Sequence, residues 1–397
     1  MKTLKSNRLH ISIFGKTNVG KSSILNTITN QETSIVSNQK GTTTDAVEKS
    51  MELFPIGPVT FIDTAGLDDD TNLGKIRIEK TLSVLNRTDI ALLVITPDGI
   101  SSYETDIIQK FDELNIPYII IVNKSDIETI HEEKKEKLKQ YTNNIIETST
   151  IKNDFINQLI STLIKIVPDD FVNPPSIIGD KINESDIVVL VTPIDKEAPK
   201  GRLILPQVQT IRDILDNNCS AIVTKQDNLV NILNSLNKKP KLVVTDSQAF
   251  KEVDEIVPKD IDLTSFSILF ARLKGDLKSF IEGAHAINNL KENDKILILE
   301  SCSHHAIEDD IATVKIPSLL QQKLGFKLNV HHKSGHDFPD ISEYKLIIHC
   351  GACMTNRKEI LSRIHAANKQ NIPITNYGII ISYCLGILDR AVKLFND

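Results

Sequence analysis

Two groups of residues in this chain have the types and the spacing to do chemistry. The first runs from Gly15 to Ser22 and fits the pattern G-x-x-x-x-G-K-[ST]. Glycines at this spacing let the backbone curl so that its N–H groups face a polyphosphate. Lys21 would then reach the β- and γ-phosphates, and the Ser22 hydroxyl would bind Mg²⁺. The motif therefore predicts a nucleotide phosphate loop.

Further polar segments follow at the intervals that a GTPase needs. In the D-x-x-G segment, Asp63 would hold Mg²⁺ through water and the Gly66 N–H would contact the γ-phosphate. Thr43 is the predicted Mg²⁺ ligand of the polar loop between the two motifs. Asp126, in N-K-S-D, would accept hydrogen bonds from the guanine N1–H and N2 amino groups, which adenine does not offer.

Together these segments predict a site for GTP and Mg²⁺. We expect its catalytic residues to be Lys21, Asn18, Thr43, Asp63 and Gly66. The full set of predicted nucleotide-binding residues is Gly15, Asn18, Val19, Gly20, Lys21, Ser22, Ser23, Thr43, Asp63, Gly66, Asn123, Lys124, Asp126 and Ser149.

The second group holds three of the five cysteines. Cys302-x-His304 is followed, after 44 residues, by His349-Cys350-x-x-Cys353. Thiolates and imidazoles are ligands for soft metal ions. On chemistry alone, a closed tetrahedral zinc site and an iron–sulfur cluster both remain open.

Apolar segments precede both groups and must position them. Residues 9–14 run into the phosphate loop, while 295–299 and 344–348 end just before the two cysteine segments. If the last two are parallel neighbours, both loops emerge at the carboxyl edge of one sheet, where open α/β sheets bind ligands. We therefore expect the thiols to converge there.

Proline-rich breaks near residues 167–175 divide the chain. After them, short apolar segments without a nucleotide motif predict a small α/β unit. The predicted fold is α/β with three domains. These are a P-loop GTPase domain at 1–167, a small α/β domain at 176–262, and an α/β domain with a parallel sheet, which carries the cysteine segments, at 263–397.

Composition narrows the range of partners. The chain has 397 residues, 40% of them hydrophobic, and a net charge of −6, which argues against wholesale nucleic-acid binding. The longest apolar run, of about twelve residues, is too short to span a bilayer. The N-terminal segment has no signal-peptide core. We expect a cytoplasmic protein with neither a nucleic acid nor a membrane as its partner.

The order of the GTPase segments resembles that of the TrmE-Era-Septin group of GTPases. Asn18, in N-V-G-K-S-S, is similar to the asparagine that coordinates K⁺ in that group, although an ordinary polar loop residue remains an alternative. Leu67 stands where Ras-like proteins place their water-orienting glutamine. The resemblance therefore implies slow hydrolysis stimulated by K⁺.

The spacing C-x-H…H-C-x-x-C resembles the pattern of the FeFe-hydrogenase maturation GTPases, and the domain order agrees along the whole chain. The resemblance implies that Cys302, Cys350 and Cys353 bind a 4Fe–4S cluster with an exchangeable fourth position. Candidates for the fourth ligand are His304, His349, Glu308 and Asp309.

The same resemblance implies a homodimer formed through the middle domain. It also implies a scaffold that receives a transient di-iron subcluster from two radical-SAM maturases and delivers it to apo FeFe-hydrogenase. Nucleotide state would tune these partner interactions. The alternatives are a zinc-stabilised regulatory GTPase and an RNA- or ribosome-associated GTPase of the TrmE-Era group.

Overall fold

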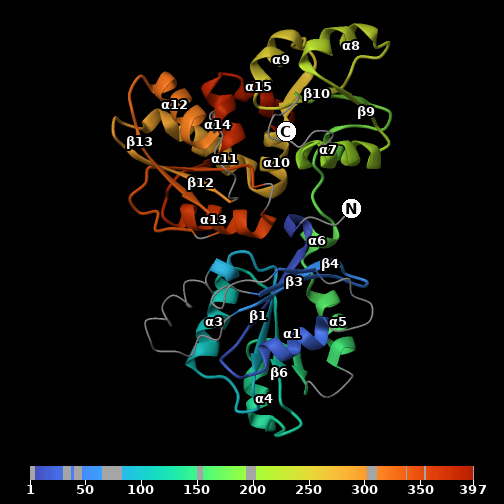
Figure 1. The fold of residues 1–397 in the computed structure, drawn as a ribbon, viewed down its shortest axis with the longest axis vertical. Coiled ribbons are helices and arrows are strands. Elements are labelled where there is room, and N and C mark those ends of the chain that lie inside the picture. Colours follow the sequence, from blue (N-terminus) through green and yellow to red (C-terminus); the bar gives the residue numbers. More distant parts are fainter. Residues whose placement is uncertain are drawn as a thin grey trace. The chain divides into compact units, whose positions relative to one another are not determined.

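The computed structural model divides the chain into two compact units, residues 1–174 and 175–397. It describes residues 5–29, 37–39, 47–64, 83–149, 155–193, 203–301, 311–336, 338–352 and 355–396. Each unit is an α/β structure (Figure 1), which confirms the predicted fold class.

The first unit is built on one seven-stranded sheet with the order β2-β3-β4-β1-β5-β6-β7. Strand β1 lies parallel to β4 and β5, and β5, β6 and β7 continue the parallel part, whereas β2 and β3 form an antiparallel edge. The strands are β1 (Leu9–Phe14), β2 (Ser37–Gln39), β3 (Val47–Leu53), β4 (Gly57–Asp63), β5 (Ile90–Ile95), β6 (Tyr118–Val122) and β7 (Ile145–Glu147).

Helices cover both faces of this sheet, so its central strands β1, β5 and β6 are buried along their whole length. Ile11 and Ile13 of β1 pack in one cluster with α1 and α5, while Phe14 points to the opposite face and packs against the tilted ring of Phe111 of α3. The helical segments are η1 (Lys5–Asn7), α1 (Lys21–Thr29), α3 (Ser102–Glu113), α4 (Glu132–Lys139), α5 (Phe155–Ile166) and α6 (Asp169–Val172).

The second unit contains two parallel four-stranded sheets, with the orders β11-β10-β8-β9 and β13-β12-β14-β15. One continuous apolar core joins them, since Val189 and Val243 of the middle sheet belong to the same cluster as Ile298 and Ile348 of the C-terminal sheet. The strands are β8 (Ile187–Val191), β9 (Ser220–Thr224), β10 (Leu242–Thr245), β11 (Asp262–Ser265), β12 (Lys295–Glu300), β13 (Asn329–Ser334), β14 (Leu346–His349) and β15 (Ile374–Asn376).

Helices of the second unit surround both sheets (Figure 1). The α-helices are α7 (Leu205–Asp216), α8 (Leu229–Ser235), α9 (Phe250–Ile256), α10 (Phe266–Lys274), α11 (Leu277–His285), α12 (Ile316–Leu324), α13 (Arg357–Lys369), α14 (Tyr377–Cys384) and α15 (Leu388–Val392). Shorter helical turns are η2 (Gly179–Lys181), η3 (Gln226–Asn228), η4 (Ala286–Asn289), η5 (Ile311–Lys315) and η6 (Lys393–Phe395).

The sheet that was expected to carry the cysteine loops is confirmed. Strands β12 and β14 are parallel neighbours, with Leu299 opposite His349, so both strands end at the same edge. Strand β11 pairs with β10, and the expected boundary between residues 262 and 263 therefore falls within a strand of the middle sheet. The division into three domains with those boundaries stays a prediction. In the part of the chain that the structure describes, no helix is long and apolar enough to cross a bilayer.

Candidate functional site

The phosphate loop leaves β1 at Gly15 and enters α1 at Lys21. Gly15 has φ +142°, and a Cβ there would lie 2.3 Å from the Val94 carbonyl oxygen. Gly20 has φ +99°, and a Cβ there would lie 2.2 Å from Nδ2 of Asn123. Both positions therefore require glycine, because the backbone conformation and the close neighbours each exclude a side chain.

The Lys21 side chain binds to the backbone of this loop. Its side chain is buried, and Nζ donates to the carbonyl oxygens of Gly15 at 2.8 Å and Lys16 at 2.7 Å. The ammonium group thus sits against the loop at the N-terminus of α1, where backbone N–H groups also favour an anion. This arrangement suits the phosphates of a nucleotide.

Ser22 and Asp63 form a hydrogen-bonded pair beside the phosphate loop. Ser22 Oγ donates to Asp63 Oδ2 at 2.7 Å, and Asp63 Oδ1 is buried without a hydrogen-bond partner among the described residues. Burial raises the pKa of Asp63 above its ordinary value, although the Ser22 hydrogen bond and the charges of Lys21 and Lys49 oppose that rise. A buried carboxylate oxygen beside a serine hydroxyl fits the oxygen-ligand preference of Mg²⁺.

The predicted base-binding loops also come together. Asn123 Nδ2 donates to the Val19 carbonyl oxygen at 2.8 Å, which ties the end of β6 to the phosphate loop. Ser125 N donates to the Thr148 carbonyl oxygen at 3.1 Å, next to the buried Ser149.

The remaining predicted nucleotide residues differ in exposure. Lys124 has φ +63°, and Asp126 is exposed to solvent. Ser23 and Asn18 are exposed as well, and Asn18 has φ +63° in the loop. Thr43, Gly66 and Leu67 lie outside the described residues, so their predicted roles stay predictions.

One contact to the phosphate loop was not anticipated. Lys16 Nζ lies 3.6 Å from Oε2 of Glu104, a buried carboxylate at the start of α3. The same oxygen accepts from Ser101 N at 2.8 Å and Ser101 Oγ at 2.5 Å. The spacing S-x-x-E at Ser101 is a helix-capping pattern and was the available signal.

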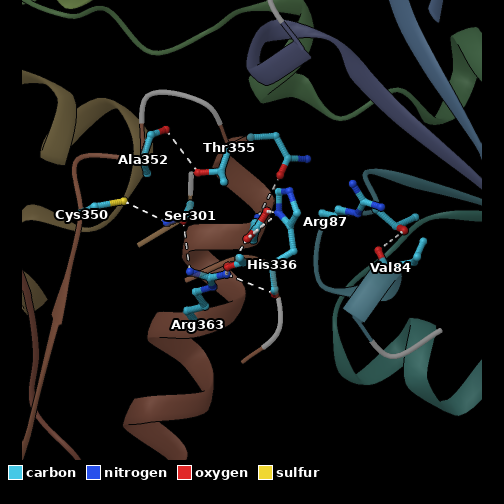
Figure 2. A network of polar contacts seen from close by, with 12 residues as sticks. Val84, Arg87, Ser301, His336, Cys350, Ala352, Thr355 and Arg363 are labelled. Atoms are coloured by element: carbon cyan, nitrogen blue, oxygen red, sulfur yellow. Dashed lines mark hydrogen bonds and ion pairs between the residues drawn. The ribbon is translucent and has the colours of Figure 1, made fainter. Parts of the chain in front are cut away.

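The cysteine site starts at the ends of β12 and β14. Cys350 follows β14 directly and is buried, and its N–H donates to the Leu299 carbonyl oxygen at 2.8 Å. Ser301, which follows β12, donates from its backbone N to Cys350 Sγ at 3.3 Å (Figure 2). The residue that precedes Cys302 in the chain is therefore in contact with the Cys350 sulfur.

Those residues of the cysteine site that the structure describes suit a soft metal centre. An N–H group pointing at a cysteine sulfur is a feature that tunes iron–sulfur clusters, and it favours the thiolate. The described residues contain no group of three or more His, Cys, Asp or Glu side chains that could hold a metal ion. Other predicted ligands lie outside the described residues, namely Cys302, His304, Glu308, Asp309 and Cys353.

His349 is the one fourth-ligand candidate that the structure describes. It is 1% exposed, and both of its ring nitrogens have protein partners. Nδ1 lies 2.8 Å from the Cys350 carbonyl oxygen, and Nε2 lies 2.6 Å from Nη1 of Arg363.

Two residues of this network, Arg363 and Glu359 on α13, were not predicted from the sequence. Arg363 Nη2 lies 2.7 Å from Glu359 Oε1, and each residue is 2% exposed. Burial acts to raise the pKa of Glu359, but the His336 hydrogen bond and the Arg363 charge outweigh it and lower that pKa. The i, i+4 spacing of opposite charges was visible, yet such pairs usually lie on exposed helix faces.

The two remaining cysteines lie apart from this pattern in the chain. Cys219 is buried, and its Sγ lies 3.0 Å from the Asn183 carbonyl oxygen. Burial raises the pKa of Cys384 to about 11, so its thiol stays protonated at neutral pH. Cys219 is therefore a small buried side chain, whereas Cys384 is only partly buried.

Three family models match the chain in consecutive segments. "50S ribosome-binding GTPase" matches residues 10–124, "Hydrogen maturase F dimerization domain" matches 177–275, and "Hydrogen maturase F tetramerization domain" matches 278–394. Between them they cover most of the chain, in the order expected from the sequence.

Curated relatives match the first part of the chain. The tRNA modification GTPase MnmE of Mesoplasma florum is 35% identical over 185 residues, which are 46% of this chain and 40% of MnmE. GTPase Der of a Nitratiruptor strain is 38% identical over 127 residues, or 31% of this chain and 27% of Der. The chain therefore spans less than half the length of either protein.

Among solved structures, Era of Aquifex aeolicus bound to GDP and AlF₄⁻ is similar, with a TM-score of 0.35 and 21% identity. The match covers 62% of this chain and 97% of Era.

Proposed function

The chain belongs to the hydrogen maturase F family, and from this premise we propose that it is a GTP-hydrolysing iron–sulfur scaffold. In this proposal the first unit binds and hydrolyses GTP, and the second holds a 4Fe–4S cluster. The scaffold carries a di-iron subcluster from two radical-SAM maturases to apo FeFe-hydrogenase. Its place is the cytoplasm.

Nucleotide binding is assigned to the residues around the phosphate loop. Lys21 would hold the β- and γ-phosphates, and Ser22 and Asp63 would hold Mg²⁺, directly and through water respectively. Asp126 would select guanine. It is exposed and follows Ser125, whose N–H donates to the Thr148 carbonyl oxygen and so joins the two base-binding loops. Asp63 Oδ1, which has no hydrogen-bond partner among the described residues, supports this assignment, because a buried oxygen is stabilised when a cation or water reaches it.

Hydrolysis is proposed to be slow and stimulated by K⁺ bound at Asn18. The exposed Asn18 side chain on the phosphate loop supports this, since a carboxamide oxygen is a suitable ligand for a hard cation. Turnover should be faster in K⁺ than in Na⁺ for the wild type, and equal in both salts for Asn18→Ala. Equal rates in both salts for the wild-type protein would contradict the K⁺ proposal.

The cluster is assigned to Cys302, Cys350 and Cys353. When bound, a 4Fe–4S cluster with three protein thiolates supplies one iron with an exchangeable position. The observation that carries this assignment is the Ser301 N–Cys350 Sγ contact of 3.3 Å, since it brings the two cysteine-bearing segments to one sheet edge. Loss of the γ-phosphate would release contacts to Thr43 and Gly66 and so tune partner docking.

A homodimer through the middle domain is part of the proposal. In support, apolar side chains on and near α7, β9 and α8 are exposed in the isolated chain. They are Leu203, Val208, Leu215, Val223 and Val230. Apolar side chains of this kind favour association when a partner subunit removes them from water.

Hydrogenase activation tests the biological role directly. Anaerobic protein supplied with the two maturases should activate apo FeFe-hydrogenase, whereas Cys350→Ser should fail to do so. Cys219→Ser is the matched control, because it also removes a buried thiol but not a predicted ligand. Wild-type protein that fails to activate the hydrogenase would count against the assigned role.

A further inference from the structure

Arg363 is a buried cation that connects three strand ends. Nη1 donates to Ser301 Oγ at 3.2 Å and to His349 Nε2 at 2.6 Å. Nη2 donates to the carbonyl oxygens of Gly335 and His336, each at 3.1 Å (Figure 2). Ser301 follows β12, Gly335 follows β13, and His349 ends β14. One guanidinium therefore holds the carboxyl ends of three neighbouring parallel strands.

Glu359 compensates the charge of Arg363. It accepts from Nη2 at 2.7 Å and from His336 Nδ1 at 3.1 Å. A buried ion pair is weak ground for a stability role, because its desolvation offsets much of its Coulomb energy. The planar fork of arginine does, however, fix geometry, since it donates in several set directions at once.

The hydrogen-bond partners of His349 determine which of its ring nitrogens carries the proton. The Cys350 carbonyl oxygen can only accept, so Nδ1 carries the proton and donates to it. The Arg363 guanidinium can only donate, so the Nε2 lone pair accepts from Nη1. Neither nitrogen has a lone pair available for a metal ion while Arg363 stays in place.

We propose that Arg363 is a positioning residue of the cysteine site, with two effects. It fixes the strand ends from which the Cys302 and Cys350 segments depart, and it keeps the His349 imidazole from binding iron. The fourth iron position is then filled by a group other than His349. The effect on iron binding by His349 rests on the proposed cluster. The hydrogen bond between Arg363 and His349 is independent of the cluster.

The first test needs no cluster. In metal-free protein labelled with ¹⁵N-histidine, we expect His349 to show the Nδ1–H tautomer with an accepting Nε2; its signals are assigned by their loss in His349→Gln. Arg363→Gln should shift the Nε2 resonance, because it removes the Nη1 donor and leaves the Nδ1 hydrogen bond to the Cys350 carbonyl oxygen. Arg357→Lys, on the same helix but bonded to the Leu273 carbonyl oxygen, should leave both resonances unchanged. A wild-type Nε2–H tautomer, or unchanged His349 resonances in Arg363→Gln, would overturn the proposal.

The second test uses protein reconstituted with iron and sulfide. Pulsed EPR of the reduced wild type should show no coupling from a His349 nitrogen, so His349→Gln should leave its spectrum unchanged. Arg363→Gln should gain a nitrogen coupling that disappears in the Arg363→Gln/His349→Gln double variant. A His349 coupling in the wild type, or no gained coupling in Arg363→Gln, would overturn the proposal.

The two tests separate this proposal from the proposed function. If wild-type protein assembles no cluster, the scaffold function fails, whereas the NMR measurement still decides the role of Arg363. If Arg363→Gln does not fold, Arg363→Lys takes its place in both tests. Its single ammonium group cannot reproduce the five contacts of the guanidinium, so it should change the His349 signals in the same direction.

Discussion

At the scale of single residues, Lys21 is the side chain on which phosphate binding depends most. Its ammonium group is buried against the Gly15 and Lys16 carbonyl oxygens, where little water screens its charge. We expect Lys21→Ala to lower GTP turnover by about 10²-fold or more, the typical effect of removing one charge-stabilising donor. Lys16→Ala, in the same loop, is the matched control and should change turnover only a few-fold. Wild-type turnover in Lys21→Ala would contradict this assignment.

Asp63 gives a prediction about pH. Burial raises its pKa, so the folded protein binds this proton more tightly than the unfolded chain. The resulting stabilisation is present below the unfolded pKa and is lost as the pH rises through the folded pKa. At pH 7 without Mg²⁺, above the ordinary pKa of an aspartate, Asp63 should therefore destabilise the fold relative to a neutral amide. We expect Asp63→Asn to have a higher Tm than wild type at pH 7 in EDTA, with the difference shrinking toward about pH 4.

Melting curves across this pH range, without and with Mg²⁺ and GDP, check the prediction. Bound Mg²⁺ should narrow or reverse the difference at pH 7, because it stabilises the wild-type carboxylate and not the amide. A pH-independent difference between the two proteins, or a less stable Asp63→Asn at pH 7 in EDTA, would show that the sign is wrong.

The residues that could be predicted share one property. Each belongs to a short motif at or directly after the end of an apolar strand, so the local sequence predicts it. These residues are Gly15, Lys21, Asp63 and Asn123. Arg363 has no such motif. Its partners after β12, β13 and β14 meet only through the strand order of a folded sheet, which single-sequence reasoning does not supply.

At the scale of elements, α11 packs so closely on β15 that a single added methyl group should disturb the contact. A Cβ on Gly283 would lie 2.0 Å from the Ile374 carbonyl oxygen, which belongs to the backbone of β15 and cannot move alone. We expect Gly283→Ala to lower the free energy of unfolding by about 1–3 kcal/mol through overpacking. Urea unfolding measures this change.

Glu282→Ala is the control for Gly283→Ala, because it is exposed on the same helix and should stay within about 0.5 kcal/mol of wild type. A Gly283→Ala protein as stable as wild type would mean that α11 and β15 are not packed this closely.

Elements were predictable where their sequences were long and apolar. Residues 187–191, 242–244 and 296–299 are runs of Val, Ile and Leu, and they lie in strands β8, β10 and β12. Strand β13 reads N-V-H-H-K-S and β15 has three residues, so neither shows a hydrophobic run. They form strands because neighbouring β12 and β14 supply their hydrogen bonds, an effect of tertiary context.

At the scale of the whole molecule, the two predicted chemistries lie in separate compact units. Removing one should therefore leave the other largely intact. We expect Cys350→Ser to lose most of its iron while its GTP turnover stays within about two-fold of wild type, and Lys21→Ala to show the reverse. Iron content and turnover measured on the same preparations check this, with Cys384→Ser as the thiol control. Parallel loss of both properties in either variant would contradict separate sites.

The central claim is that Cys302, Cys350 and Cys353 hold iron on a protein whose other unit binds guanine nucleotide. Metal and sulfide analysis of freshly made anaerobic protein, with EPR after reduction, tests it most directly. We expect brown protein with about four iron and four sulfide ions per chain and the signal of a reduced 4Fe–4S cluster. Colourless protein with about one zinc ion per chain and no such signal would contradict it.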